Sequence, residues 1–347
     1  MAATEPHATP VPLEAEVAFL RQPRNYPEPT SRVEAVETHM SWVFLTDQHA
    51  YKLKKPVCHD ELDARTVERR RFYCEEELRL NRRLAAPVYL AVLPLTLERH
   101  GHLQLDGKGE AVDWLVKMRR LPATLMLDHM IPAAAASEAT LYPVIALLAA
   151  FYKSSAAVAI TPDEYHRRLA SLMEKNRIRL RAPAYLLQIQ TLDRIFANLD
   201  SFLQAQAAIL DDRVRGGHII EGHGDLRAEH VYLGHPPAVI DCIEFSRSLR
   251  IADSADEICF LALECERLGN RMLGSALLHR YAELSGDTPP AALTSFYRAL
   301  RATTRATLSI RHLDEEKFRY SPEWRRRAND YLQLADRHAG IAVSMQP

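Results

Sequence analysis

The chain has 347 residues, of which 47% are hydrophobic and 26% charged, so it can bury one large core or two moderate ones, and wholesale disorder is not expected. Lys and Arg number 44 and Asp and Glu 45, and the formal net charge of -1 gives no overall attraction to nucleic acid or anionic lipid. The five cysteines form no Cys-x-x-Cys pair, which argues against a disulfide framework and a structural zinc site and favours a reducing cytoplasm.

The N-terminal region predicts a short helix at 13–20 and a Pro-rich connector that ends near residue 30. No basic segment leads into an apolar run there, so we expect no signal peptide. The most apolar stretch, Leu141–Phe151, is too short to cross a bilayer, and it predicts a buried helix rather than a membrane anchor.

Residues 31–121 predict a small α+β lobe. Two strand-like runs flank the polar turn Thr46–Gln48 and form a predicted hairpin, which Pro56 ends. A helix follows, because Tyr73, Glu77 and apolar residues after them recur at helical spacing. The predicted elements are strands at 42–45 and 50–54, a helix at 66–84, and strands at 89–97 and 111–118.

Residues 122–347 predict a mainly helical lobe, with the lobe boundary near Pro122. Ser137 is a candidate N-cap for the first long helix. The expected helices are 138–152, 162–180, 185–211 and three more after Asp253, one of them containing 296–311. Strand-like pieces at 218–233 and 238–245 interrupt this pattern and flank polar residues.

The strongest local signal lies in these two pieces. The first contains His223-Gly224-Asp225 and the second contains Ile240-Asp241. Phosphoryl transfer needs one carboxylate that orients an acceptor hydroxyl and a second that holds magnesium against the phosphates. A short loop followed by a hairpin brings two such carboxylates close together, whereas a lone surface aspartate would need neither neighbour.

These motifs resemble the His-Gly-Asp-x-x-x-x-Asn loop and the metal-binding aspartate of aminoglycoside phosphotransferases and their choline kinase relatives. The resemblance implies a two-lobed protein kinase-like fold, ATP and Mg²⁺ as cofactors, Asp225 as catalytic residue and Asp241 as metal ligand. Asp253 and the segment 256–258 resemble the acidic stretch that braces this loop. One position departs from the pattern: His230 replaces the asparagine, and imidazole is a softer ligand than an amide oxygen.

Two longer strings, at 37–45 and 74–83, resemble a bacterial subgroup in which the phosphotransferase-like part is often fused to a P-loop ATPase half. The chain contains no Gly-x-x-x-x-Gly-Lys-[Ser/Thr] motif, so it resembles the kinase-like half alone, from about residue 30 to about 315. A P-loop ATPase is therefore a candidate partner. The basic runs 69–71 and 325–327 lack interleaved aromatic residues and are interpreted as solvated faces rather than nucleic-acid contacts.

A kinase also needs a lysine that contacts the α- and β-phosphates and a helix glutamate that holds the lysine. Lys52 and Lys54 share one strand face because side chains alternate along a strand. Lys52 is favoured by the preceding Ala50, and Lys54 remains open; either one could instead be an exposed edge-strand lysine. Glu77 is the expected partner. Met118 lies where a kinase hinge would place backbone groups against adenine.

Arg301 and Arg305 recur four residues apart on a predicted helix and are candidates to contact the acceptor. If they face the cleft, the acceptor is anionic; if they do not, they form a solvated face. The sequence thus predicts an ATP-dependent phosphotransferase that acts on a hydroxyl of a small molecule. The alternative is a pseudokinase that binds nucleotide without transfer, which His230 and the missing Gly-rich loop favour.

Overall fold

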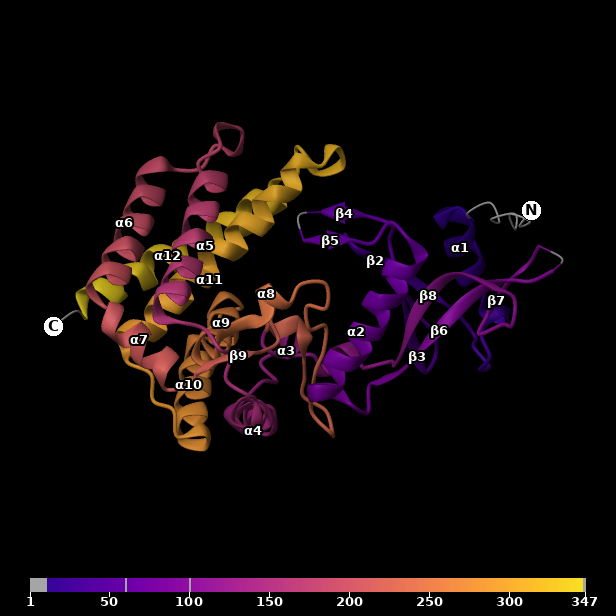
Figure 1. Cartoon of the computed structure of the whole chain (residues 1–347), viewed down its shortest axis with the longest axis horizontal. Helices are drawn as coiled ribbons and strands as arrows, with labels where there is room; N and C mark the ends of the chain where they lie inside the picture. Colours follow the sequence, from indigo (N-terminus) through magenta and orange to yellow (C-terminus); the bar gives the residue numbers. More distant parts are fainter. Residues whose placement is uncertain (1–10, 60, 100, 346–347) are drawn as a thin grey trace, which may run out of the picture. The chain divides into compact units, whose positions relative to one another are not determined.

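The computed structural model describes residues 11–59, 61–99 and 101–345. They form two compact units. The first holds the described residues up to Pro122 together with Ala238–Arg247, and the second holds Ala123–Pro237 and the described residues from Ser248 onward. An antiparallel sheet dominates the first unit and helices dominate the second (Figure 1), which confirms the expected α+β class.

The sheet of the first unit has six antiparallel strands in the order β1-β2-β3-β8-β6-β7. The predicted hairpin is present, and β1 and β7 are edge strands that the sequence pattern missed. The strands are β1 Glu34–Glu37, β2 Ser41–Leu45, β3 His49–Lys54, β6 Tyr89–Leu97, β7 Leu103–Leu105 and β8 Glu110–Arg119. A small hairpin, β4 Cys58–His59 and β5 Leu62–Asp63, precedes the helix α2.

Helices α1 (Leu13–Leu20) and α2 (Val67–Ala85) belong to the first unit. The hydroxyl of Thr66 accepts a hydrogen bond from the backbone N–H of Arg69 and caps α2, which packs on β6 and β8. Tyr51 and Leu53 of β3 lie in a core with residues of α1. Lys52 and Lys54 alternate with these two residues, so they leave the strand on the other face and reach α2.

Glu16 of α1 is a buried carboxyl group whose titration should affect the stability of the fold. It is 3% exposed and faces Asp113, which accepts a 2.8 Å bond from Arg70. Burial and the negative charge of Asp113 raise the pKa of Glu16 to about 8, from an ordinary value of 4.5. The folded state therefore binds this proton more tightly than the unfolded state.

Between about pH 4.5 and 8 the folded state keeps this proton while the unfolded state has released it, so the free energy of unfolding is expected to fall as the pH rises, by at most about 1.4 kcal/mol per pH unit. Glu16→Gln should remove this slope in urea titrations across that pH range. Glu14→Gln, at an exposed position on the same helix, is the matched control and should keep most of the slope, because the charge of Glu14 is the smallest of the causes that raise the pKa of Glu16. Equal slopes in the two variants would contradict the assignment.

The second unit is mostly helical. Ser137 caps α4 in a reciprocal capping box with Thr140, as expected from the sequence. The longer helices are α4 Glu138–Ser154, α5 Pro162–Leu180, α6 Ile189–Ala205, α7 Ala207–Arg215, α9 Ser254–Arg267, α10 Arg271–Ser285, α11 Ala291–Arg311 and α12 Pro322–Ser344. Strand β9 (Ile219–Glu221) pairs with β12 (Ile251–Asp253) and brings the motif loop next to the start of α9.

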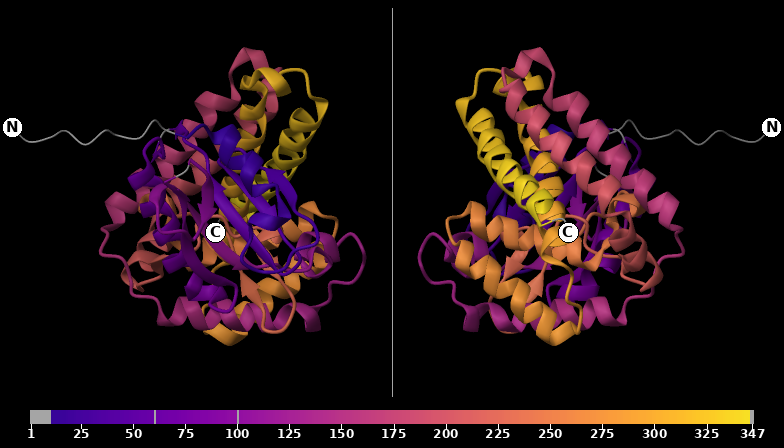
Figure 2. Two further views of the ribbon diagram at one scale, coloured as in Figure 1. Left: turned by 90° about the vertical axis from the view of Figure 1, so that its right-hand side faces the viewer. Right: turned by 90° about the vertical axis from the view of Figure 1, so that its left-hand side faces the viewer.

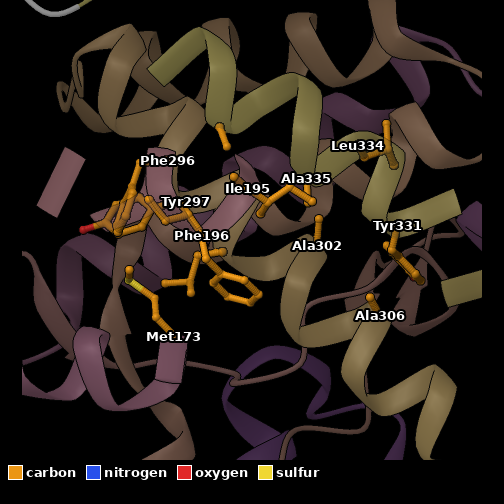
Figure 3. Packing of buried hydrophobic residues seen from close by; sticks show 14 of the residues in the cluster. Met173, Ile195, Phe196, Phe296, Tyr297, Ala302, Ala306, Tyr331, Leu334 and Ala335 are labelled. Carbon is orange, nitrogen blue, oxygen red and sulfur yellow. The ribbon is translucent and has the colours of Figure 1, made fainter. Parts of the chain in front are cut away.

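The core of the second unit lies among α5, α6, α11 and α12. Both views of Figure 2 show α11 and α12 side by side, and Figure 3 shows the side chains packed between these helices. Small residues such as Ala302 and Ala335 let the backbones approach, while Phe202 and Phe296 stack with ring centroids 4.4 Å apart. This packing makes α11 a fixed platform, and α11 carries both Arg301 and Arg305.

Three sequence predictions for residues 185–345 are wrong. The single helix expected at 185–211 is two helices, because Leu186 has a left-handed backbone (φ 54°) and Gln206 lies outside helical geometry. Among the described residues, four long helices, not three, follow Asp253. The strand expected at 238–245 covers only Ala238–Val239, since Asp241 has a left-handed backbone (φ 61°) that cannot continue a strand.

Candidate functional site

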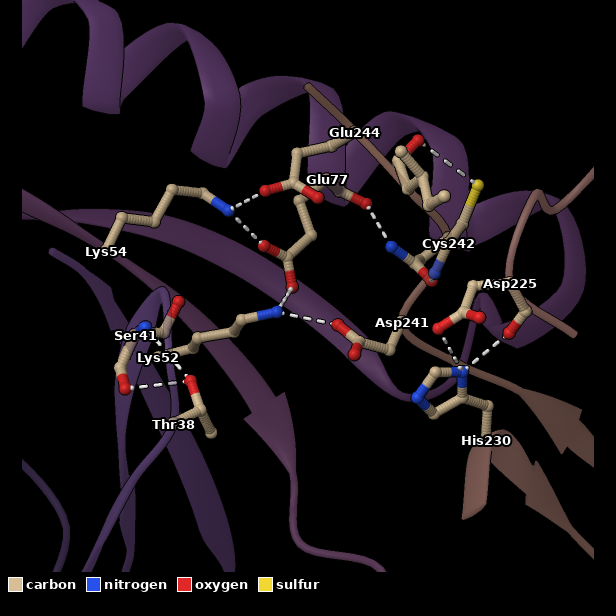
Figure 4. Close-up of polar contacts among 12 residues, drawn as sticks. Thr38, Ser41, Lys52, Lys54, Glu77, Asp225, His230, Asp241, Cys242 and Glu244 are labelled. Atoms are coloured by element: carbon tan, nitrogen blue, oxygen red, sulfur yellow. Dashed lines mark hydrogen bonds and ion pairs between the residues drawn. The ribbon is translucent and has the colours of Figure 1, made fainter. Parts of the chain in front are cut away.

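In the first unit, two lysines of β3 meet a single glutamate of α2 (Figure 4). Lys52 Nζ lies 2.9 Å from Glu77 Oε1 and 2.7 Å from Asp241 Oδ1. Lys54 Nζ lies 2.5 Å from Glu77 Oε2 and also binds Glu244. The structure thus brings together all five residues, which come from β3, from α2 and from the segment after β11 (Ala238–Val239).

The two lysines differ in accessibility. Lys54 is 4% exposed and lies between the buried Glu77 and the largely covered Glu244, whereas Lys52 is 15% exposed and binds Asp241, whose side chain is 44% exposed. Burial lowers the pKa of each lysine, but the carboxylates outweigh it and raise both pKa values above the ordinary one. Burial raises the pKa of Glu77, but the two ammonium groups outweigh it and lower the pKa. Lys52, Lys54 and Glu77 are therefore charged at neutral pH.

Two polar residues that sequence reasoning missed position Asp241. The backbone N–H of Asp241 donates to the hydroxyl of Tyr89 (3.1 Å), and the N–H of Cys242 donates to Asn81 Oδ1 (2.9 Å). Asn81 is one helical turn after Glu77 on the buried face of α2, so a polar residue on an apolar stripe was the available signal. These bonds hold the left-handed turn at Asp241.

In the second unit, Asp225 lies among cationic groups. Arg227 Nε lies 2.8 Å from Asp225 Oδ2, and Arg305 Nη1 lies 3.6 Å from Oδ1. Burial raises the pKa of Asp225, but the charges of Arg227 and Arg305 outweigh it and hold the pKa well below its usual range. Asp225 is therefore an ionised, weakly basic carboxylate that remains about a fifth exposed.

His230 turns toward Asp225 as well. Its Nδ1 lies 2.8 Å from the carbonyl oxygen of Asp225, which can only accept, so Nδ1 carries the proton (Figure 4). Nε2 then presents its lone pair to Arg227 Nη2, at 3.2 Å. Both ring nitrogens are engaged, and this tautomer fixes His230 as a support for the loop and for the guanidinium of Arg227.

Two acidic residues of α9 brace the loop that carries His223, Gly224 and Asp225, as the family resemblance implied. Glu257 is 1% exposed and accepts hydrogen bonds from the backbone N–H groups of His223 (2.8 Å) and Gly224. Asp256 pairs with Arg301 through two bonds of 2.8 and 2.7 Å, and Arg301 donates to the carbonyl oxygen of Gly224. Arg301 is thus committed to the loop, whereas Arg305 points at Asp225.

Glu257→Leu is expected to lower the free energy of unfolding by about 3 kcal/mol or more, because two buried N–H groups lose a charged acceptor. Glu257→Gln keeps one acceptor oxygen and should lose about half as much. Both values follow from urea denaturation. Gly222→Ala is an independent check, since its Cβ would lie 2.2 Å from Glu257 Oε2 and displace that carboxylate. A Leu variant as stable as the parent would contradict this bracing role.

Met118 lies outside the two groups of contacts described above, whereas the predicted metal ligands Asp241 and His230 each belong to one of them. Met118 lies in β8 opposite Ala50 and Tyr89 and is 9% exposed. Its expected contact with adenine stays a prediction. Within the described ranges, no cluster of three or more His, Cys, Asp or Glu side chains could hold a metal ion by itself. Asp241 thus stands as a single carboxylate, and any ion there would need further ligands from a bound molecule or water.

No helix among the described residues is long and apolar enough to span a membrane.

In sequence, the chain is 33% identical over 316 residues to uncharacterised proteins of Mycobacterium tuberculosis and Mycobacterium bovis. The match covers 88% of this chain but only 59% of those relatives, so the chain spans about three fifths of their length. No protein-family model matches the chain.

Solved structures resemble the chain over nearly its whole length. A choline/ethanolamine kinase family protein from Mesorhizobium loti gives a TM-score of 0.54 at 15% identity, covering 95% of this chain and 98% of its own. A spectinomycin phosphotransferase in its AMP-bound complex gives 0.56 at 13% identity, with 97% and 100% covered. A choline kinase from Cryptosporidium parvum gives 0.53 at 10% identity, with 94% and 97% covered. The chain therefore has the protein kinase-like fold of the aminoglycoside phosphotransferases and the choline and ethanolamine kinases.

Proposed function

We propose that the chain is an ATP-dependent phosphotransferase that acts on a hydroxyl group of a small molecule. The observation that carries the proposal is the Lys52–Glu77 ion pair (2.9 Å) with Asp241 on the same ammonium group. A strand lysine held by a helix glutamate is the arrangement with which kinases contact nucleotide phosphates. The solved structures that share the fold, a spectinomycin phosphotransferase and choline kinases among them, support the same class.

In this proposal Lys52, rather than Lys54, contacts the phosphates. Its ammonium group is the more accessible of the two, and its second partner, Asp241, is nearly half exposed. Lys54 is enclosed by Glu77 and Glu244 and holds Glu77 in place. Met118 and its neighbours on β8 would read adenine through backbone groups.

Asp241 is the carboxylate that fits Mg²⁺, because it is exposed and offers hard oxygen atoms. Two ammonium groups and the carboxylates Glu77, Asp241 and Glu244 leave the cluster one negative charge, which a cation would neutralise. Bound magnesium would neutralise phosphate charge during transfer. His230 does not fit this role as it stands, since its Nε2 faces Arg227; we propose that it positions Asp225 instead.

Asp225 is proposed to orient the acceptor hydroxyl. Its low pKa makes it a poor proton acceptor at neutral pH, which suits a reaction whose barrier is lowered mainly by positioning and charge neutralisation. Arg227 keeps Asp225 ionised and fixes the orientation of its carboxylate.

A P-loop ATPase partner and a cytoplasmic location also stay predictions.

The pseudokinase remains the second candidate, because Arg227 occupies both Asp225 and His230. The deciding experiment incubates the protein with γ-labelled ATP, magnesium or manganese, and a metabolite extract, beside an Asp225→Asn control. Label transfer that the control lacks supports the enzyme. Nucleotide-dependent thermal stabilisation without transfer supports the pseudokinase, and neither stabilisation nor transfer refutes both.

A further inference from the structure

Arg305 of α11 is an under-paired cation. Its side chain is 12% exposed, and within the described ranges its one ion pair is the 3.6 Å approach to Asp225, which is too long for a good hydrogen bond. Its Nε is buried without a hydrogen-bond partner. A largely enclosed guanidinium whose Nε is buried without an acceptor is unfavourable, so the position is better explained by an anion that completes its contacts.

Arg327 of α12 repeats this pattern. Its Nη2 lies 3.9 Å from Glu229 Oε2, its Nε is buried without a partner, and it lies over the ring of Trp324 at 5.8 Å. The sequence pattern suggested a solvated face here, but the side chain is only 27% exposed. An arginine ordered by an aromatic ring, with donors to spare, is suited to bind a planar or tetrahedral anion.

The two arginines lie at opposite ends of one series of ion-paired side chains. Arg305 approaches Asp225, Arg227 binds both Asp225 and Glu229, and Arg327 approaches Glu229. Three guanidinium groups thus surround two carboxylates and leave one positive charge. His312 follows the last residue of α11 and is close enough to both arginines to feel their charge. Burial lowers its pKa, and the positive charges of Arg327 and Arg305 lower it further, although Glu315 raises it.

We infer that the acceptor carries an anionic group, a phosphate or a carboxylate, and that Arg305 and Arg327 bind this group while Asp225 orients the hydroxyl. The identification of the ligand as the acceptor rests on the proposed function. A cationic acceptor would meet unpaired positive charge beside the loop, because both carboxylates are already paired with arginine. Arg301, which Asp256 neutralises, takes no part in this binding.

The test uses the full chain without nucleotide and three probes on one carbon skeleton: glycerol 3-phosphate, glycerate and glycerol. Binding is followed by the ¹⁵N–¹H signals of the arginine Nε groups and by thermal shift at constant ionic strength. The two anionic probes are expected to move the signals of Arg305 and Arg327, and glycerol is expected to leave them unchanged. The anionic probe that binds more tightly shows whether the site prefers a phosphate or a carboxylate group.

Arg305→Gln and Arg327→Gln should each weaken binding of the stronger anionic probe at least 10-fold, because each removes one charged, multiply hydrogen-bonding contact. Arg326→Gln, an exposed neighbour on the same helix, is the matched control and should bind as the parent does. Binding that survives both variants, or equal responses to the three probes, would overturn the inference. If Arg305→Gln does not fold, the signals of the parent and of Arg327→Gln decide.

The outcome is independent of the labelled-ATP experiment. Anion binding at Arg305 without phosphoryl transfer would keep the anion site and remove the phosphotransferase. Transfer without anion binding at Arg305 would keep the enzyme and remove the anionic acceptor.

Discussion

Lys54→Met is expected to lower the free energy of unfolding by about 3–5 kcal/mol, whereas Lys52→Met should largely spare the fold and abolish most nucleotide-dependent activity. Lys54 separates two carboxylates that are 0% and 12% exposed, so its loss leaves buried negative charge without its partner. Lys52→Met leaves Glu77 paired with Lys54, and the exposed Asp241 can be solvated. Its loss should lower kcat/KM for ATP roughly 10²–10³-fold, the usual effect of removing one charge-stabilising donor.

Urea denaturation and ATP turnover separate these two effects. Lys153→Met, at an exposed position on α4, serves as the control and should change neither quantity. If the two strand lysines exchanged these phenotypes, Lys54 would be the phosphate contact. If neither variant affected turnover, the nucleotide would bind elsewhere.

Asp225→Asn is expected to lower the transfer rate roughly 10²–10⁴-fold while leaving nucleotide binding intact, since an amide cannot orient the hydroxyl as a carboxylate does. Because Arg227 and Arg305 hold the pKa of Asp225 below its usual range, the carboxylate is ionised at every pH above about 4. The stability that this pairing contributes is present above that pH and is lost only as the pH falls further.

The pH–rate profile of the parent should therefore show no acid limb from Asp225 between about pH 5 and 8. The matched variant is Arg227→Gln, which leaves Arg305 as a weaker partner and should raise the pKa of Asp225 toward its ordinary value. A limb near pH 6 that disappears in Asp225→Asn would instead assign Asp225 the role of a general base and contradict its proposed role.

The strands and helices whose apolar residues repeat regularly were predictable, because periodicity reports which face is buried. Helices α1 and α5 begin and end where the sequence indicated, and β3 carries both lysines on one face. The breaks at Leu186 and Asp241 were not predictable in this way, since a left-handed backbone at a non-glycine residue depends on contacts distant in sequence.

Some residues of the candidate site could likewise be predicted from the sequence, and others could not. Lys52, Glu77 and Asp241 were inferred from residue type and resemblance, and the structure brings them into contact. Asn81 and Arg227 were missed because their roles arise from hydrogen bonds to the backbone and side chains of other segments. Residue type alone cannot show whether an arginine braces a loop, as Arg301 does, or keeps a hydrogen-bond donor without an acceptor, as Arg305 does.

The ten residues 238–247 belong to the same compact unit as the sheet, although more than a hundred residues separate them from it in sequence. Until the ribosome has made this segment, the ammonium groups of Lys52 and Lys54 have only Glu77 to share. The nascent first unit therefore carries surplus positive charge and an unfilled position beside Asn81, and we expect a truncated chain that stops at Pro122 to be protease-sensitive. Assembly of the cluster of Lys52, Lys54, Glu77 and Asp241 is in this sense a late step of folding, because it brings together residues that are far apart in the sequence.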